Sequence, residues 1–210
     1  AKAGAMRFNT DLSQLEIHDG NQWTAILATS PELQTGGTRG IWGGGGPSAT
    51  TTIDFVQVDN TGNAIDFGDL LGNELYTRGY ASRTRGLWAQ SVGPVTNQIE
   101  FITIAQQANS QDFGDLTQDS QSGCHTGDST RCCFFQGRNP TENVISFVTI
   151  ASTGNAVDFG DMTRGVRHSC AVQSPTRGIV PGGWSNQPSN GNTSIIQYIT
   201  TSTLGNSADF

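Results

Sequence analysis

The chain has 210 residues and a formal net charge of −7, with 27 glycines and only 14% charged side chains. This length can bury a sizeable core, and the low charged fraction excludes a coiled coil or a highly charged disordered tail. The acidic balance argues against binding to nucleic acid or to an anionic membrane surface, because both need a basic patch. No apolar run approaches the roughly 20 residues that cross a bilayer, so we expect no membrane insertion. Because the chain starts at Ala1 and stops inside a repeated motif, we expect a segment of a longer protein.

Residues 1–26 are predicted to form an N-terminal β-hairpin that serves as an attachment segment. Apolar and polar residues alternate from Leu15 to His18, Asp19-Gly20-Asn21 has turn chemistry, and the strand pattern resumes from Gln22 to Ile26. A lone hairpin cannot bury its own apolar face. We therefore expect it to pack on the rest of the chain or on a neighbouring chain.

The same stretch has an ordered set of residue types: Met6-Arg-Phe-Asn-Thr10, Leu15-Glu16, Asp19-Gly20 and Trp23. This order resembles a short module common in bacteriophage tail-fibre and other virion proteins, which runs Arg-aromatic-Asn-Thr, then Leu-Glu, then Gly and Trp. The match covers about a tenth of the chain. The resemblance implies a virion protein.

Residues 27–210 are predicted to be a repeat domain. The motif Asn63-Ala-Ile-Asp-Phe-Gly-Asp69 returns at 109–115 and 155–161, a spacing of 46 residues, and begins again at Asn206. A Thr-Arg pair keeps the same spacing through three steps, at Arg39, Arg85, Arg131 and Arg177. Two unrelated motifs with one period define four units: 39–84, 85–130, 131–176 and 177–210.

Each unit contains a β-rich run in which apolar residues occupy both alternating phases, as in Ile53-Asp-Phe-Val-Gln-Val58. Such a strand belongs to a sheet that is covered on both faces. The sequence therefore predicts an all-β fold of four repeated sheet units, and we favour a four-bladed β-propeller because stacked blades cover each other. A trimeric or stacked β fibre, which would bury the same faces between chains, is the alternative.

The number of motifs does not decide whether the four blades of the predicted propeller close into a ring. Only three Asp-Phe-Gly-Asp copies are complete, so we expect the fourth blade to lack its last strand. Either residues 15–37 supply that strand and close the ring, or the protein continues past Phe210 with more repeats. The Gly-rich strands resemble kelch and chromosome-condensation-regulator propellers without the full motif of either. The Arg-Gly-aromatic and Asn-x-x-Asp-Phe-Gly-Asp-Leu repeats resemble virion proteins of marine phages.

The recurring polar residues are predicted to be structural, because a catalytic group is rarely needed four times. The recurring carboxylates are Asp66, Asp112, Asp158 and Asp209 and, three positions later, Asp69, Asp115 and Asp161. A calcium loop needs more ligands and an acidic closing residue, so we expect no metal and no cofactor. We expect Asp to cap a tight turn whose Gly has a positive φ, and the phased Arg to pair with Asp. The motif Phe residues, Trp42 and Trp88 are expected in the core.

Four cysteines stand at Cys124, Cys132, Cys133 and Cys170, and the first and last are one period apart. A structural zinc site would need a second matched ligand pair, which the sequence lacks. We expect buried thiols or a local disulfide, and three connectivities stay open.

Function is expected where the repeats differ, in loops on the rigid scaffold. The loop after the fourth Arg is longer than its equivalents and carries a tryptophan among Gly, Ser and Asn, which suits stacking on a sugar. The predicted binding residues are Trp184, Asn186, Asn190, Asn192, Gln136 and Arg138. We see no convincing carboxylate pair for glycoside hydrolysis and no nucleophile motif.

These observations favour a non-enzymatic virion structural or adhesion protein, such as a tail fibre, head fibre or capsid decoration. Expected partners are other virion proteins and a host surface glycan or protein, and a homo-oligomer is expected. A carbohydrate-active tailspike enzyme and a soluble lectin-like module are the alternatives.

Overall fold

The computed structural model describes residues 1–10, 14–26, 37–93, 95–137, 143–185 and 191–210. These residues form strands, turns and no helix, so the predicted all-β class is confirmed. The described part of the chain accordingly holds no helix that could cross a membrane. The chain divides into two compact units, residues 1–34 and 35–210. The predicted division after residue 26 adjoins residues 27–36, which lie outside the described part.

The N-terminal unit is a three-stranded antiparallel sheet of β1 (Met6–Asn9), β2 (Gln14–His18) and β3 (Trp23–Ala25), in that order. The expected hairpin is β2–β3, and Asp19 Oδ1 accepts hydrogen bonds from the backbone N–H groups of residues 21 and 22, each at 2.8 Å. The prediction missed β1, whose side chains Met6 and Phe8 join Leu15 on one exposed apolar face.

The opposite face of this small sheet is held by polar contacts. Glu16 is buried and forms an ion pair with Arg7 at 2.8 Å, and the Arg7 guanidinium stacks 4.3 Å from the Trp23 ring. A hydrogen bond from Asn9, and then one from Arg7, lowers the pKa of the Glu16 carboxyl. The small unit thus buries the carboxylate of Glu16 on one face and exposes Met6, Phe8 and Leu15 on the other.

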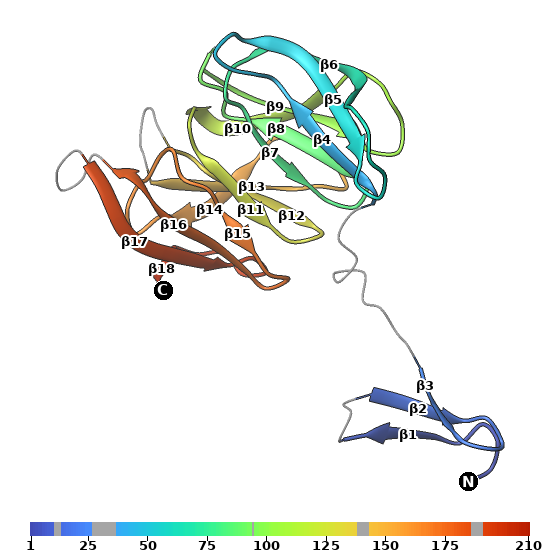
Figure 1. The fold of residues 1–210 in the computed structure, drawn as a ribbon. Helices are drawn as coiled ribbons and strands as arrows, with labels where there is room; N and C mark the ends of the chain where they lie inside the picture. The colour runs from blue at the N-terminus through green and yellow to red at the C-terminus, as the bar shows by residue number, and fades with distance from the viewer. Residues whose placement is uncertain (11–13, 27–36, 94, 138–142, 186–190) are drawn as a thin grey trace. The chain divides into compact units, whose positions relative to one another are not determined.

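The repeat unit consists of four antiparallel sheets in which sequence neighbours pair, and Figure 1 shows them following one another in chain order. The first sheet contains β4 (Arg39–Gly43), β5 (Thr50–Gln57) and β6 (Ile65–Glu74). The second contains β7 (Arg78–Ala81), β8 (Arg85–Ala89), β9 (Thr96–Thr103) and β10 (Gln111–Ser120). The third contains β11 (Cys124–Gly127), β12 (Arg131–Phe135), β13 (Val144–Thr149) and β14 (Val157–Asp161). The fourth contains β15 (Val172–Gln173), β16 (Arg177–Ser185), β17 (Gly191–Thr200) and β18 (Ala208–Asp209).

The limits of the sheets differ from the limits of the sequence repeats. Strands β7, β11 and β15 precede the Thr-Arg pair that opens each repeat, yet each pairs with the strand that follows it. Each of the last three sheets therefore takes its first strand from the preceding repeat. The expectation that the fourth unit lacks its last strand is wrong, since β18 pairs with β17.

The Asp-Phe-Gly-Asp motif is a β-bulge and not the tight turn expected from the sequence. In β6 the register steps from Asp66 opposite Asp54 to Gly68 opposite Ile53, so Phe67 is the extra residue. The same shift occurs in β10 and β14. The bulge turns Phe67 into the interior, where it is 3% exposed, and gives Gly68 a φ of +150°.

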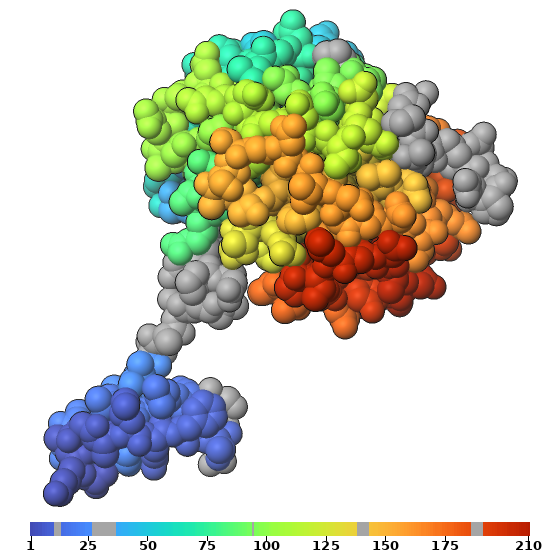
Figure 2. Space-filling model, turned by 180° about the vertical axis from the view of Figure 1, so that it is seen from behind, coloured from blue at the N-terminus to red at the C-terminus, as the bar shows by residue number. Residues whose placement is uncertain are grey.

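Apolar cores lie between successive sheets. Between the first and second sheets, Ile53, Phe55 and Phe67 pack with Trp88 and Ile102. Two equivalent cores join the second sheet to the third and the third to the fourth. In Figure 2 the green, yellow, orange and red residues of these sheets follow each other in contact across the repeat unit. Burial on both sheet faces, as predicted, is confirmed for the two middle sheets.

The two outer sheets are not joined into a ring. Trp42 on the first sheet is 58% exposed and Phe210 after the fourth is 65% exposed, although both were expected in the core. They are exposed because no further described sheet covers them. Strand β2 pairs with β1 on one side and with β3 on the other, so the described residues of 15–37 add no strand to the repeat sheets.

Candidate functional site

The phased arginines join each sheet to the next. The Nη1 atoms of Arg39, Arg85 and Arg131 donate to the backbone carbonyls of Ile104, Ile150 and Thr201, at 2.6, 2.8 and 2.9 Å respectively. Each guanidinium also stacks 4.7 to 5.0 Å from an aromatic ring of its own sheet. The expected Arg–Asp pairing is therefore wrong, because the acceptor is a carbonyl one sheet further along.

The Asn that opens the motif makes a second contact between sheets. Asn109 Oδ1 accepts from the backbone N–H of Asp69 at 3.1 Å, and the same contact recurs from Asp115 to Asn155 and from Asp161 to Asn206. The carboxylate of Asp69 accepts from Thr51 Oγ1 at 2.8 Å. The earlier aspartates of the motif are exposed, and we observe no side-chain hydrogen bond from them to another described residue: Asp66, Asp112, Asp158 and Asp209.

The predicted loop residues are only partly brought together. Trp184 on β16 is 37% exposed and lies opposite the exposed Asn192 of β17, and the Arg167 guanidinium lies 6.0 Å from its ring. Gln136 is fully buried and donates from Nε2 to Thr117 Oγ1 and Ser146 Oγ, at 3.0 and 2.7 Å. This position favours packing over contact with a surface ligand. Asn186, Asn190 and Arg138 lie outside the described residues.

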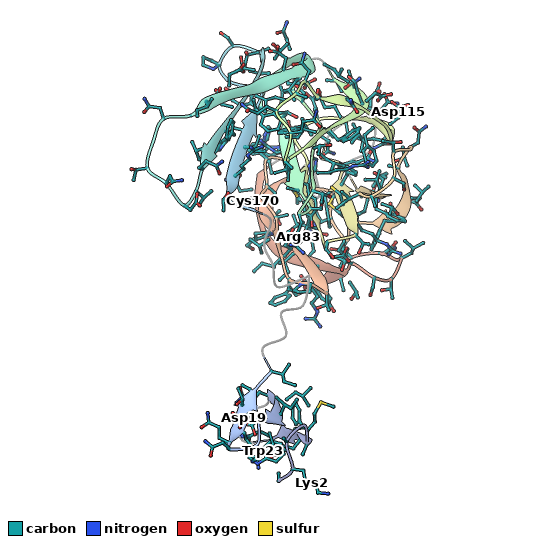
Figure 3. The ribbon with its side chains drawn as sticks, turned by 90° about the vertical axis from the view of Figure 1, so that its right-hand side faces the viewer. Lys2, Asp19, Trp23, Arg83, Asp115 and Cys170 are labelled. Carbon is teal, nitrogen blue, oxygen red and sulfur yellow. The ribbon has the colours of Figure 1, made fainter. Side chains whose placement is uncertain are left out.

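A pocket that the sequence analysis missed lies where the first strands of successive sheets approach each other. Its volume is about 440 Å³, and its lining includes Arg78 of β7, His125 beside Cys124 in β11, and Cys170 with His168 ahead of β15. Residues 78, 124 and 170 are spaced by 46, so one repeat position contributes three different side chains. That spacing was the available signal. In Figure 3, Cys170 is drawn near the middle of the repeat unit, and Asp115 lies near its upper right margin.

Burial decides the electrostatics of this pocket. Burial, assisted by the nearby Arg78 charge, lowers the pKa of His125 to about 3, so its ring is neutral. The Gln90 amide donates to Ser120 Oγ and to the Phe135 carbonyl, so its Oε1 accepts from His125 Nε2 at 3.0 Å. His125 Nδ1 is then a buried acceptor with no described partner.

The thiols of the chain are free, and three of the four are buried. Burial raises the pKa of Cys124 to about 12, which keeps it protonated and unsuited to attack a substrate or ligate a metal at neutral pH. No group of three His, Cys, Asp or Glu in the described residues could hold a metal ion. The lining of the pocket combines the Arg78 cation with the Ser169 hydroxyl, which suit a small polar ligand, while the His125 Nδ1 acceptor is buried in its wall.

The structure also brings together two carboxylates that the sequence analysis did not pair. Glu74 and Glu100 are 7% and 3% exposed, and burial raises the pKa of both, with the Glu100 charge contributing to the shift of Glu74. Glu100 Oε2 accepts from the Leu71 backbone N–H at 2.8 Å and from Ser110 Oγ. Glu100 thus accepts hydrogen bonds from groups of the first two sheets, and both carboxylates are shielded from solvent.

Comparison with known proteins adds no identity to this geometry. No protein-family model matches the chain, and the comparison with curated proteins finds no significant match.

Proposed function

We propose that this chain is a non-enzymatic structural or adhesion protein of a phage particle, acting as a tail fibre, head fibre or capsid decoration. One observation carries the proposal: the arginines and asparagines that recur with the repeat join one sheet to the next. Three interfaces repeat the same arginine-to-carbonyl and amide-to-asparagine contacts. Residues used in this way form a stiff scaffold, while the first aspartate of each motif, such as Asp66, lies exposed on its surface. Stacking of this type is that of propeller blades, and we include a propeller-like arrangement in the proposal.

The placement in a virion is supported by the resemblance of residues 6–23 to tail-fibre modules. The N-terminal unit is a separate compact body, and its exposed Met6, Phe8 and Leu15 are suited to attachment to another virion protein. Such a segment would leave the repeat unit to face outward.

Adhesion is supported by the surface around Trp184. An exposed tryptophan beside Asn192 and Arg167 combines an aromatic face with amide and guanidinium hydrogen-bonding groups. This combination binds sugars, because the ring packs on C–H groups and the polar groups bind hydroxyls. A host surface glycan is therefore the ligand class that we favour, and a host protein is the other.

An enzymatic tailspike is less well supported. Glycoside hydrolysis needs two carboxylates that flank a bond of the substrate. Among the described residues, the carboxylates with raised pKa are Glu74 and Glu100, and both are buried.

The test measures first whether the protein is present in phage particles and then whether it binds glycans. Mass spectrometry of purified particles from the phage that encodes the chain should find it as a stoichiometric component. Its absence from particles would favour the soluble lectin-like alternative. A glycan array should then show binding that Trp184→Ala abolishes, whereas Trp42→Ala, at a tryptophan that is more exposed (58% against 37%), retains it. Release of reducing sugar from a bound glycan would identify an enzyme.

A further inference from the structure

Every interface between sheets in the repeat unit joins two different faces. The forward face of a sheet carries the phased arginine and the buried isoleucine that begins the β-rich run, as Arg39 and Ile53 do in the first sheet. The back face of the next sheet carries Trp88 and the acceptor carbonyl of Ile104. Forward and back faces meet three times within the chain.

The back face of the first sheet is uncovered. Trp42 is 58% exposed there, and Val58 is 69% exposed. Five of their six counterparts in later sheets are buried by the preceding sheet, with exposures of 6% for Trp88, 0% for Phe134 and Val180, 1% for Ile150 and 0% for Thr201. The sixth, Ile104, is half-buried. The sequence therefore keeps an apolar side chain at both positions of the first sheet although no described residue covers them.

The forward face of the fourth sheet is uncovered in the same way. Ile196 is 41% exposed, whereas its three counterparts, Ile53, Ile99 and Ile145, are fully buried. Arg177 stacks 4.8 Å from the Tyr198 ring, which is the pose of the other phased arginines on their own aromatic residues. Arg177 is exposed, while the other three are half-buried against the next sheet. Its guanidinium is held in position to donate, as its counterparts do.

We propose that the fourth sheet of one copy docks its forward face on the back face of the first sheet of a second copy. The Arg177 guanidinium then donates to the Val58 carbonyl of the other copy, and Ile196 packs beside Trp42. A second copy is the occupant because each face already fits the other type of face three times in this chain. The two faces lie on the sheets at opposite ends of the series in Figure 1, so one chain can use both at once. This assembly is head-to-tail and produces a closed ring or a filament. It goes beyond the proposed function and does not depend on it.

The first experiment measures the mass of the full chain by light scattering and sedimentation over a range of concentrations. The chain should associate, and Val58→Asp or Arg177→Glu should each weaken association roughly 10- to 100-fold, because each removes a contact that involves a desolvated or charged group. Val157→Asp is the matched control: Val157 is 53% exposed on β14 and lies on no end face. It should associate like the natural chain. Circular dichroism melting of dilute, dissociated protein should differ little among the three variants, because none of the three side chains is buried in the single chain. Trp42→Ser is a second variant that should block the back face.

The second experiment mixes the two blocked copies. The Val58→Asp copy keeps an unchanged forward face, and the Arg177→Glu copy keeps an unchanged back face. In the mixture these two faces should bind each other and form a 1:1 heterodimer that adds no further copies. A natural chain that stays monomeric at its solubility limit overturns the proposal. So does association that both variants leave unchanged, or association that Phe8→Ser alone abolishes. Failure of the mixed variants to pair rules out the head-to-tail geometry.

Discussion

Replacing Gly114 by alanine should separate two sheets that the motif glycines hold in contact. Gly114 lies in the bulge of β10 with a φ of +143°, and a Cβ atom there would lie 2.5 Å from both the carbonyl carbon and the carbonyl oxygen of Gly154. These are backbone atoms that cannot rotate away. Strain at this φ costs about 1–3 kcal/mol, and the overpacking adds about 1–3 kcal/mol. We expect the free energy of unfolding to fall by about 2–6 kcal/mol.

Gly154→Ala separates the two contributions. Gly154 has a φ of +152°, but a Cβ atom there would have no neighbour within 4 Å. This variant should lose only the conformational part, about 1–3 kcal/mol. Urea unfolding of the full chain, followed by tryptophan fluorescence, gives both values. Equal losses for the two variants would refute the conclusion that glycine is needed there for close approach of the sheets.

Arg85→Ala should lower the free energy of unfolding by about 2–3 kcal/mol, because it removes a hydrogen bond from a charged group to the next sheet. Arg177→Ala should cost monomeric protein less than about 1 kcal/mol, since it removes stacking alone, and equal losses in urea titrations would contradict this. Burial raises the folded-state pKa of Glu74 above its ordinary 4.5, so its ionisation lowers stability as pH rises, and Glu74→Gln should raise the melting temperature at pH 8 but not at pH 4. A constant difference across that range would argue against the buried carboxyl as its cause. Iodoacetamide at pH 8 should label Cys170 alone, because burial raises the pKa of the other three thiols, and a second label by mass spectrometry would disagree.

The sequence predicts those parts of the architecture that depend on the alternation of apolar residues and on the repeat period. Apolar residues on both alternating phases of the β-rich runs predict strands covered on both faces, and the cores between sheets confirm this for the two middle sheets. The first sheet differs, because Val58 on its back face is 69% exposed. The Asp-Phe-Gly-Asp sequence predicts a tight turn where the structure has a β-bulge, because both structures use a glycine with positive φ next to an aspartate. The residue types of the motif alone do not distinguish a bulge from a turn.

The burial of a residue and its hydrogen-bond partners depend on which sheet lies next to it. The repeat pattern in the sequence does not show which sheet that is. Trp42 and Trp88 have nearly the same local sequence, yet one is exposed and the other is 6% exposed because only the second has a sheet behind it. The acceptor for Arg85 is a carbonyl 65 residues away with no sequence pattern of its own. The pocket around Arg78 was missed because the repeat position it shares with Cys124 and Cys170 carries unlike side chains. The virion function, the partners and the glycan remain predictions.

The offset between repeat and sheet decides where the chain can be divided. Each sheet of the repeat unit is continuous in sequence, and the second runs from Arg78 to Ser120. A cut before Arg85, where a sequence repeat begins, would separate β7 from β8, the strand with which it pairs. A cut between Ser120 and Cys124 divides no sheet, so the exchangeable module of this chain is the sheet and not the sequence repeat.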